Sequence, residues 1–422
     1  MEKATMFYVD PQHENRILYY GWVVTGAGLI IMTVETGILL TFGVFFKPIL
    51  AEFGWTKAQL SSVFSAFMSV RIVASLPVGY LADRFGVRIV VLLGAVLAST
   101  SLFFTSTFRN LWELYLYYSI LFSIGTSCAY IPVTSAVSRW FRRKRGLAIG
   151  IVVLGLGLGT LVMTPLTGLL ISSYGWRKSY FVLGLMLFVV FVGCGVLLKQ
   201  RPKSFHEREN TDAACDTLII SEDDSYNLRQ AIYTSAFWTQ GATWFFLSFA
   251  LYSVLIHIVS YAINLGVQPI KASAILGMIG GCSLLGRVIM GSISDKLGRR
   301  RSTVISSLMN LAALTGMLVS SDLLMFYGSC FVFGFSYGGW GAQMPAMCAD
   351  HFGEKNSGSI LGGIFLLGQA GMAIGPWSVA YMIDLMGSYK PLFLATVGAS
   401  LLGFLFSLLI EPPDKKRHLK SS

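Results

Sequence analysis

Charged side chains are scarce in this sequence. They account for 13% of its 422 residues, whereas 54% of the residues are hydrophobic. An ordinary soluble domain carries about 25% charged residues, and a soluble protein of this length could not cover its surface with so few charges. The composition therefore excludes a water-soluble globular protein and predicts one that crosses a membrane many times.

Motifs for catalysis and metal binding are also absent from the sequence. It contains no G-x-x-x-x-G-K-[ST] nucleotide loop and no cluster of metal ligands, and its six cysteines form no C-x-x-C pair. Five of these cysteines lie in apolar segments, where cysteine is typically a small buried side chain. We therefore expect neither an enzyme nor a metal or organic cofactor.

Basic residues give the chain a net charge of +11, but they lie in short segments between apolar runs, such as RWFRRKRG (139–146) and DKLGRRR (295–301). This distribution argues against a nucleic-acid partner, because Lys and Arg beside membrane helices accumulate on the cytoplasmic side. We expect the protein to lie in the plasma (cell inner) membrane, with these segments and both termini on its cytoplasmic side. The lipid bilayer is the expected environment, and no obligatory protein partner is evident.

Apolar runs long enough to cross a bilayer, which takes about 20 residues, recur along the chain. Their length favours helices over strands, so the predicted fold class is an all-α membrane protein. We predict twelve transmembrane helices, near residues 20–46, 58–82, 88–107, 112–138, 146–171, 176–199, 237–264, 271–294, 302–320, 324–349, 357–383 and 389–410.

The two halves of the sequence resemble one another. The segment GYLADRFGVR (79–88) matches GSISDKLGRR (291–300) at an offset of 212 residues. The same offset relates three further pairs, Gly146 with Gly358, Gly150 with Gly362, and Gly159 with Gly371. Parallel six-helix repeats are typical of transporters that bind their substrate near mid-membrane, between the repeats.

The repeat divides the chain into two six-helix bundles and three polar segments. The predicted parts are a cytoplasmic N-terminal segment (1–19), the first bundle (20–200), a cytoplasmic linker (201–230), the second bundle (231–410) and a cytoplasmic tail (411–422).

The repeated G-x-x-x-D-R/K-x-G-x-R segment resembles the signature loop of the major facilitator superfamily. Within that superfamily, YYGWVV (19–24), FGVFFKPI (42–49) and RWFRRKRGLAIG (139–150) resemble the monocarboxylate transporters and the related oxalate/formate antiporters. The resemblance covers about residues 20–410. It implies the major facilitator superfamily fold, alternating access between two six-helix bundles, and an organic anion as substrate.

Four titratable side chains lie deep within predicted spans: Glu35, Arg71, His257 and Arg287. A charge at the bilayer centre costs at least about 2.5–3.5 kcal/mol, so each is a functional candidate. No acidic residue of the second half lies at the depth of Arg287, and an unpaired guanidinium suits a ligand carboxylate, which it binds through two parallel hydrogen bonds. The resemblance implies the same role, because an arginine of helix 8, eight residues before the loop aspartate, binds the substrate carboxylate in these transporters.

Glu35 and Arg71 lie at similar depth in helices 1 and 2, roughly 22 Å and 18 Å from the same membrane face. Three interpretations stay open. The two side chains form a structural ion pair, Glu35 accepts the transported proton, or Arg71 is a second substrate contact.

His257 is either a buried core residue or a substrate contact that also relays a proton, since a neutral imidazole donates one hydrogen bond and titrates near physiological pH. Aromatic residues complete the predicted site. The resemblance to the oxalate/formate antiporters implies a cavity position for Tyr130, ten residues before Trp140. Tyr337, Trp340 and Phe365 are candidates for the same pocket, although aromatic residues at helical spacing are often packing residues.

Two departures from the family pattern bear on the substrate. Animal monocarboxylate transporters carry a lysine where Leu40 stands and an aspartate where Ser283 stands, so Glu35 and His257 are the remaining candidates for proton transfer. Ser283 is included among the predicted substrate contacts. The oxalate/formate antiporters carry a lysine in helix 11, whereas FLLGQAGMAIGP (365–376) contains none. One unpaired cation matches one carboxylate, which favours a small monocarboxylate such as lactate or pyruvate.

The charged loops of the repeat are better interpreted as gates. We expect contacts that close one membrane face and break between states, formed by Asp83, Arg84, Arg88, Asp295 and Arg299.

The leading hypothesis is a symporter that transports a small monocarboxylate together with a proton. The proton is the expected coupling ion. The alternative is an exchanger of oxalate/formate-type anions or dicarboxylates, in which Arg71 acts with Arg287. A third hypothesis is a membrane sensor without transport. It would need an additional cytoplasmic domain, for which the predicted linker (201–230) and tail (411–422) are too short.

Overall fold

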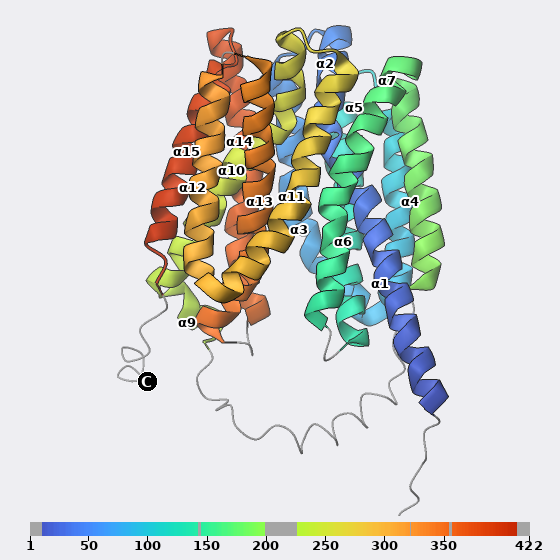
Figure 1. Ribbon diagram of the computed structural model, residues 1–422. Coiled ribbons are helices and arrows are strands. Elements are labelled where there is room, and N and C mark those ends of the chain that lie inside the picture. The colour runs from blue at the N-terminus through green and yellow to red at the C-terminus, as the bar shows by residue number, and fades with distance from the viewer. Residues whose placement is uncertain (1–10, 142–144, 199–225, 321, 354–356, 412–422) are drawn as a thin grey trace, which may run out of the picture.

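The structure is a computed structural model that describes residues 11–141, 145–198, 226–320, 322–353 and 357–411, and these residues contain helices and turns but no strand. The elements are α1 (Pro11–Leu40), α2 (Phe42–Phe53), α3 (Lys57–Phe85), α4 (Val87–Thr105), α5 (Leu111–Leu114), the π-helix η1 (Tyr115–Phe122), α6 (Ser123–Trp140), α7 (Arg145–Leu197), α9 (Leu228–Ile232), α10 (Ser235–Asn264), α11 (Pro269–Leu297), α12 (Arg299–Val319), α13 (Leu323–Phe352), α14 (Ser357–Met386) and α15 (Lys390–Leu408). Figure 1 shows their arrangement.

The predicted polar segments fall only partly within the described residues. Helix α1 begins at Pro11, inside the predicted N-terminal segment. The predicted linker lies outside the described residues up to 225, and its last residues begin α9. The predicted tail lies outside them from residue 412 onward.

The predicted twelve membrane crossings are confirmed. In the described part of the chain, ten segments are long and apolar enough to cross a membrane. One of these segments, Leu147–Leu197, contains two helices, because α7 turns at Gly175 with φ 78° and ψ 165°. The long α13, of 30 residues, adds the remaining crossing. At about 1.5 Å per residue it is long enough to span the hydrocarbon slab.

Local sequence signals explain where these helices begin and turn. Gly175 has a positive φ, which glycine adopts without the steric penalty of a side chain. The start of α3 is a capping box, in which the Thr56 hydroxyl accepts from the Gln59 N–H at 3.1 Å and the Gln59 side chain accepts from the Thr56 N–H at 3.0 Å. These signals place the turns between successive crossings.

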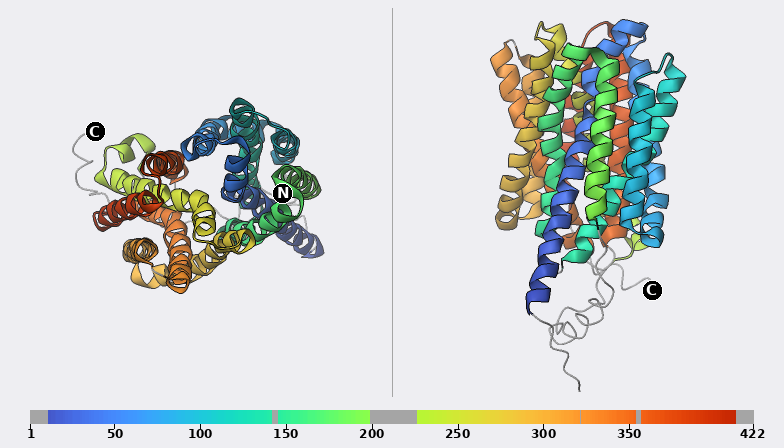
Figure 2. Two further views of the ribbon diagram at one scale, coloured as in Figure 1. Left: turned by 90° about the horizontal axis from the view of Figure 1, so that it is seen from above. Right: turned by 90° about the vertical axis from the view of Figure 1, so that its right-hand side faces the viewer.

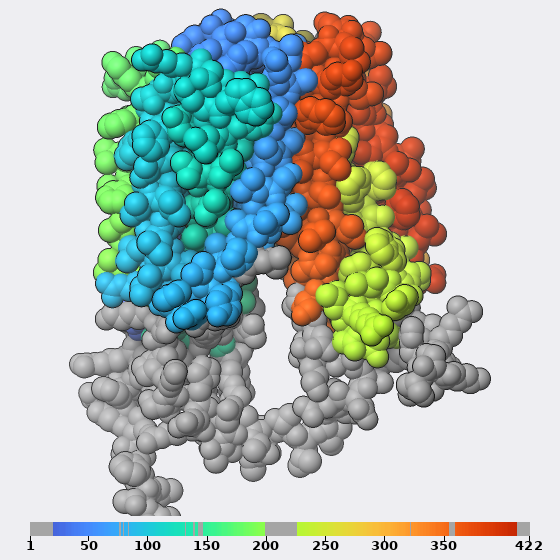
Figure 3. Space-filling model, turned by 180° about the vertical axis from the view of Figure 1, so that it is seen from behind, coloured from blue at the N-terminus to red at the C-terminus, as the bar shows by residue number. Residues whose placement is uncertain are grey.

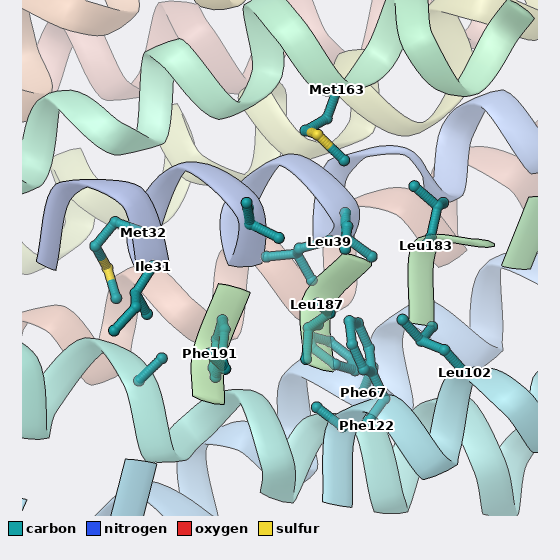
Figure 4. Packing of buried hydrophobic residues seen from close by; sticks show 14 of the residues in the cluster. Ile31, Met32, Leu39, Phe67, Leu102, Phe122, Met163, Leu183, Leu187 and Phe191 are labelled. Carbon is teal, nitrogen blue, oxygen red and sulfur yellow. The ribbon is translucent and has the colours of Figure 1, made fainter. Parts of the chain in front are cut away.

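Each half of the chain packs around its own apolar core. The first core is built almost entirely from α1 to α7, and the second mainly from α10 to α15. Seen along the bundle axis, the halves stand side by side (Figure 2). Figure 4 shows part of the first core, with Ile31, Met32, Leu39, Phe67, Leu102, Phe122, Met163, Leu183, Leu187 and Phe191 labelled. This is the predicted arrangement of two six-helix repeats.

The halves meet through α7 against α11 and α3 against α14. We call the end of the bundle where α3 begins the closed end, and the end where α9 lies the open end. At the closed end, Lys57 forms an ion pair with Asp384 at 3.4 Å, and Asp384 also accepts a hydrogen bond from the Ala58 N–H at 2.7 Å. Figure 3 shows the halves in contact toward the closed end and parted toward the open end.

Candidate functional site

A close crossing of α11 and α13 fixes the position of Arg287. A Cβ atom on Gly338 would collide with the carbonyl oxygen of Ser283 and would lie 2.8 Å from the backbone nitrogen of Arg287. A Cβ atom on Gly286 would collide with the carbonyl oxygen of Phe335. Only glycine permits this approach, as small residues do at helix contacts in membranes. The crossing brings Arg287 next to Tyr337.

Arg287 contacts neutral groups from both halves. Its Nη1 donates to the Val153 carbonyl of α7 at 3.1 Å, and its Nη2 donates to the Tyr337 hydroxyl of α13 at 3.1 Å. The guanidinium carbon also lies 5.3 Å from the centre of the Tyr337 ring, within range of a cation–π interaction. Among the described residues, no carboxylate lies within ion-pair distance of Arg287. A half-buried cation without a counter-ion is costly, and a bound anion would remove that cost.

Arg71, in contrast, already has a carboxylate partner. Its Nη2 lies 2.8 Å from Oε1 of Glu35, whose side chain is 1% exposed. The Thr36 hydroxyl donates to the second carboxylate oxygen at 2.8 Å. Both members of the pair belong to the first half, α1 and α3, so the pair does not link the halves. The structure thus shows the ion pair that the matching depths make feasible.

Three tyrosines accompany these charges. Tyr337 contacts Arg287 directly, and Tyr130 and Tyr252 lie within electrostatic range of both arginines. Tyr130 comes from α6 of the first half and Tyr252 from α10 of the second. The arginines and tyrosines therefore form one polar region that both halves supply.

Tyr252 was missed by the sequence reasoning. It packs against the cores of both halves, and its ring centre lies 6.1 Å from that of Phe64. In the sequence it stands in an apolar stretch five residues before His257, where a tyrosine looks like a packing residue. The sequence did contain an indication of a polar role for Tyr252, because a phenolic hydroxyl in a membrane helix needs a polar partner.

Trp340 and Phe365 form an aromatic layer next to Tyr337. The Trp340 ring lies 5.7 Å from that of Tyr337 and 5.1 Å from that of Trp244, which in turn lies 5.8 Å from Phe365. Trp340 is buried and packs beside Tyr337, and the predicted pocket roles of Trp340 and Phe365 stay predictions.

Ser283 lies at the crossing of α11 and α13, and its predicted role as a substrate contact stays a prediction. Its side chain is fully buried, and its hydroxyl donates to the Gly280 carbonyl of the same helix at 2.7 Å. The hydroxyl is therefore satisfied by its own helix.

His257 lies at the contact between the halves toward the closed end. It is seven residues, or about 10 Å, from the end of α10. Its Nε2 lies 3.0 Å from the Pro376 carbonyl of α14 and 3.4 Å from the Ser61 hydroxyl of α3. Its ring packs edge-on against Phe46 at 5.1 Å. Within the described part of the chain, no interaction joins His257 to Arg287. His257 therefore belongs to the contact between the two halves and not to the surroundings of Arg287.

The predicted gate residues lie near the open end. Arg299 pairs with Asp295 at 2.6 Å and reaches Asp350 at 3.7 Å, all within the second half. Arg84 and Arg88 are exposed, and Arg84 lies 5.4 Å from the ring of Phe85 on its own helix. The side chain of Asp83 lies outside the described residues. The described residues place no ion pair between the halves at this end, and the predicted gating role stays a prediction.

The chain was compared with known protein families and structures. The sequence profile of the Major Facilitator Superfamily matches residues 23–376 and 282–422. Monocarboxylate transporter 12 of Xenopus laevis is 25% identical over 89% of this chain and 85% of its own. Monocarboxylate transporter 13 of Bos taurus is 28% identical over 91% and 87%, and monocarboxylate transporter 3 of Rattus norvegicus is 28% identical over 89% and 76%.

Solved structures support the fold. A bacterial homologue of the human lysosomal transporter Spinster, in an inward-facing and unoccupied conformation, superposes with a TM-score of 0.76 at 16% identity, over 95% of this chain and 98% of that one. Its inward-facing and occupied conformation gives a TM-score of 0.72, also at 16% identity, over 97% and 99%. At this identity the likeness concerns the fold alone.

Proposed function

The chain belongs to the Major Facilitator Superfamily of membrane transporters, and from this premise we propose that it carries a small monocarboxylate such as lactate or pyruvate by alternating access. The main support for this proposal is the environment of Arg287. Arg287 lies deep in the bundle, contacts both halves, and has only neutral partners among the described residues. The names of the relatives, monocarboxylate transporters, support the substrate class.

The contacts of Arg287 indicate how an anion would bind. A carboxylate that approaches the guanidinium accepts two charge-assisted hydrogen bonds, which are stronger than the present bonds to a carbonyl and a phenol. Tyr337, held against the guanidinium, sets its orientation, and Tyr130 and Tyr252 offer hydroxyl groups to the remainder of the substrate. Because α7 supplies one partner and α13 the other, an anion bound here would change the contacts between the halves.

The Glu35–Arg71 pair is the proposed site of proton coupling. A proton on Glu35 would remove the negative charge that holds Arg71 and would free this guanidinium. His257 is the second candidate, and its contact with Pro376 and Ser61 would couple its protonation to the closure between the halves. Either route makes transport a symport of one anion with a proton.

The alternative is exchange of a dicarboxylate or an oxalate/formate-type anion between Arg287 and Arg71. The ion pair argues against this alternative, because Arg71 would have to leave Glu35, a carboxylate that is 1% exposed. The leaving step would expose a buried charge without compensation. A monocarboxylate requires only the arginine that lacks such a partner.

The direction of the chain in the membrane is also a proposal. Arg299, Arg300 and Arg301 begin α12 at the open end, and basic residues favour the cytoplasmic side. We place the open end and the charged loops in the cytoplasm of a cell whose plasma membrane holds the protein.

Uptake into proteoliposomes with an imposed pH gradient tests the function. Radiolabelled lactate or pyruvate should accumulate when the outside is acidic, and unlabelled oxalate inside should not accelerate uptake. Accumulation that ignores the gradient but follows internal oxalate would favour the exchanger instead.

The variant Arg287→Lys tests the binding site in the same assay. It keeps the charge but loses the planar fork, and losing one charge-assisted hydrogen bond should lower uptake about 10- to 100-fold. Arg229→Lys, an exposed arginine of α9, is the matched control and should transport normally. Normal uptake by Arg287→Lys would remove Arg287 from the site.

A further inference from the structure

A hollow lies at the open end, within the second half of the chain. It is a cavity of about 360 Å³ between the start of α12 and the end of α15, lined by Arg300, Arg301, Val304, Ile305 and Leu408. Two of these side chains are cationic and three are apolar. The surface of the cavity is almost entirely apolar, because the two arginines line it mainly with their aliphatic stems.

The two arginines form the rim of this cavity in different ways. Arg300 is held in place, because its Nη2 donates to the Leu408 carbonyl at 2.6 Å and lies 4.0 Å from Glu411. Arg301 is exposed and forms no ion pair with a described carboxylate. One guanidinium is therefore fixed at the mouth of the cavity, and the other is available to a ligand.

The surroundings of the cavity are apolar and exposed. Ile305 is 39% exposed, Leu308 49%, Leu405 45% and Leu409 61%. These side chains lie on the outer surface of membrane-crossing helices, where lipid covers them. The cavity is therefore open to the bilayer at the depth where α12 begins and α15 ends, which is the level of the lipid headgroups.

We propose that this cavity binds an anionic phospholipid, with its phosphate on Arg300 and Arg301 and the upper part of an acyl chain against Val304, Ile305 and Leu408. Charge complementarity supports this occupant, because basic pockets between membrane helices on the cytoplasmic side bind anionic headgroups. The proposal rests on the cytoplasmic placement of the open end and is independent of the transported substrate.

The internal repeat shows that the site belongs to the second half. At the offset of 212 residues, Arg300 corresponds to Arg88, but Arg301 corresponds to Ile89. The first half thus lacks the second cation at this place. An anionic lipid should consequently bind one half and not the other.

Thermal unfolding of the full-length protein in a neutral detergent tests the proposal. Dioleoyl phosphatidylglycerol should raise the melting temperature, whereas dioleoyl phosphatidylcholine and inorganic phosphate should not. In Arg301→Gln, half-maximal stabilisation should need at least about tenfold more of the anionic lipid, because a charge-assisted hydrogen bond is lost. Arg229→Gln, which removes the same charge from α9 at the same end, should respond like the native protein.

A second variant separates the apolar wall from the charges. Ile305→Trp fills the cavity but keeps both arginines, and it should also weaken the response to the anionic lipid. Equal responses of Arg301→Gln and Arg229→Gln would overturn the proposal, as would equal responses to the two lipids. Stabilisation by inorganic phosphate alone would show a simple anion site and would overturn it as well.

Discussion

Two arginines lie in the middle of the helix bundle, and their surroundings differ. Arg71 is neutralised by Glu35 at 2.8 Å, whereas Arg287 bonds to a carbonyl and a phenol. The first arrangement is stable without a ligand, because the desolvation of both charges is compensated within the chain. The second has only neutral partners among the described residues. This difference between two side chains of the same type is the basis for assigning them different roles.

Tyr337 provides a test of how Arg287 is held. Tyr337→Phe keeps the ring next to the guanidinium but removes the hydroxyl that accepts its hydrogen bond. A hydrogen bond to a charged group contributes about 1.5–3 kcal/mol, so the KM for the monocarboxylate should rise about tenfold or more. Uptake kinetics measure this, with Tyr327→Phe on the same helix as the control. An unchanged KM would show that the hydroxyl does not position Arg287.

Glu35 provides a test of the ion pair. Glu35→Gln leaves Arg71 without its counter-ion, and breaking a buried pair costs about 3–5 kcal/mol. Because the Arg71 side chain is 18% exposed, we expect the lower end of that range, seen as a lower melting temperature. The double variant Glu35→Gln/Arg71→Gln removes both charges and should regain most of the lost stability.

The same two variants test proton coupling. If Glu35 carries the proton, uptake by the double variant should no longer respond to the imposed pH gradient. If Glu35→Gln melts at the same temperature as the native protein, the ion pair has no structural role. If uptake by the double variant still responds to the pH gradient, His257 and not Glu35 is the proton carrier.

At the scale of elements, glycines decide where the helices touch. The α11–α13 crossing depends on Gly286 and Gly338, and α7 approaches α1 at Gly159, where a Cβ atom would collide with the Thr33 carbonyl. The helices on either side of the polar region are thereby brought close to one another. Backbone contacts of this kind cannot adjust as a side chain does, so the positions tolerate glycine alone.

Gly338→Ala tests the crossing of α11 and α13. The added methyl group meets backbone atoms, and forced packing of this kind costs about 1–3 kcal/mol; we expect a lower melting temperature and reduced uptake. Gly328 on the same helix has no atom within 4 Å of its added Cβ. Gly328→Ala should therefore be neutral or more stable, since alanine favours a helix by about 1 kcal/mol. Similar losses in both variants would show that α13 responds to helix propensity and not to the crossing.

At the scale of the whole molecule, the halves are joined at one end and parted at the other. The Lys57–Asp384 ion pair and the contact of Asp384 with the Ala58 N–H close one end. Lys47 adds a hydrogen bond to Asn264 at 3.3 Å. Alternating access requires these contacts to break, so that the polar region opens to the other side.

A crosslink at the closed end tests this movement. In the variant Lys57→Cys/Asp384→Cys, a short thiol-specific reagent with a cleavable disulfide should join the halves and stop uptake, and reduction should restore it. Each single variant, treated with the same reagent, is the control. Continued uptake by the crosslinked double variant would show that the closed end does not need to open.

The sequence alone determined the number of crossings, the repeat and the depth of Arg287 in its helix. Each of these is a local property: an apolar run of a given length forms a membrane helix, a repeated segment keeps its offset, and the spacing from Arg287 to Asp295 sets a depth. The family resemblance led to the same superfamily that the profile comparison shows.

Tertiary structure alone decided which side chains meet. Position along a helix gives the depth of a residue but not the face of a neighbouring helix that it contacts. Packing between helices therefore decided that Ser283 is buried, that His257 lies at the contact between the halves, and that Tyr252 packs against the cores of both halves. It likewise decided that Arg71 meets a carboxylate while Arg287 does not, because helix rotation and approach depend on contacts between segments far apart in the chain.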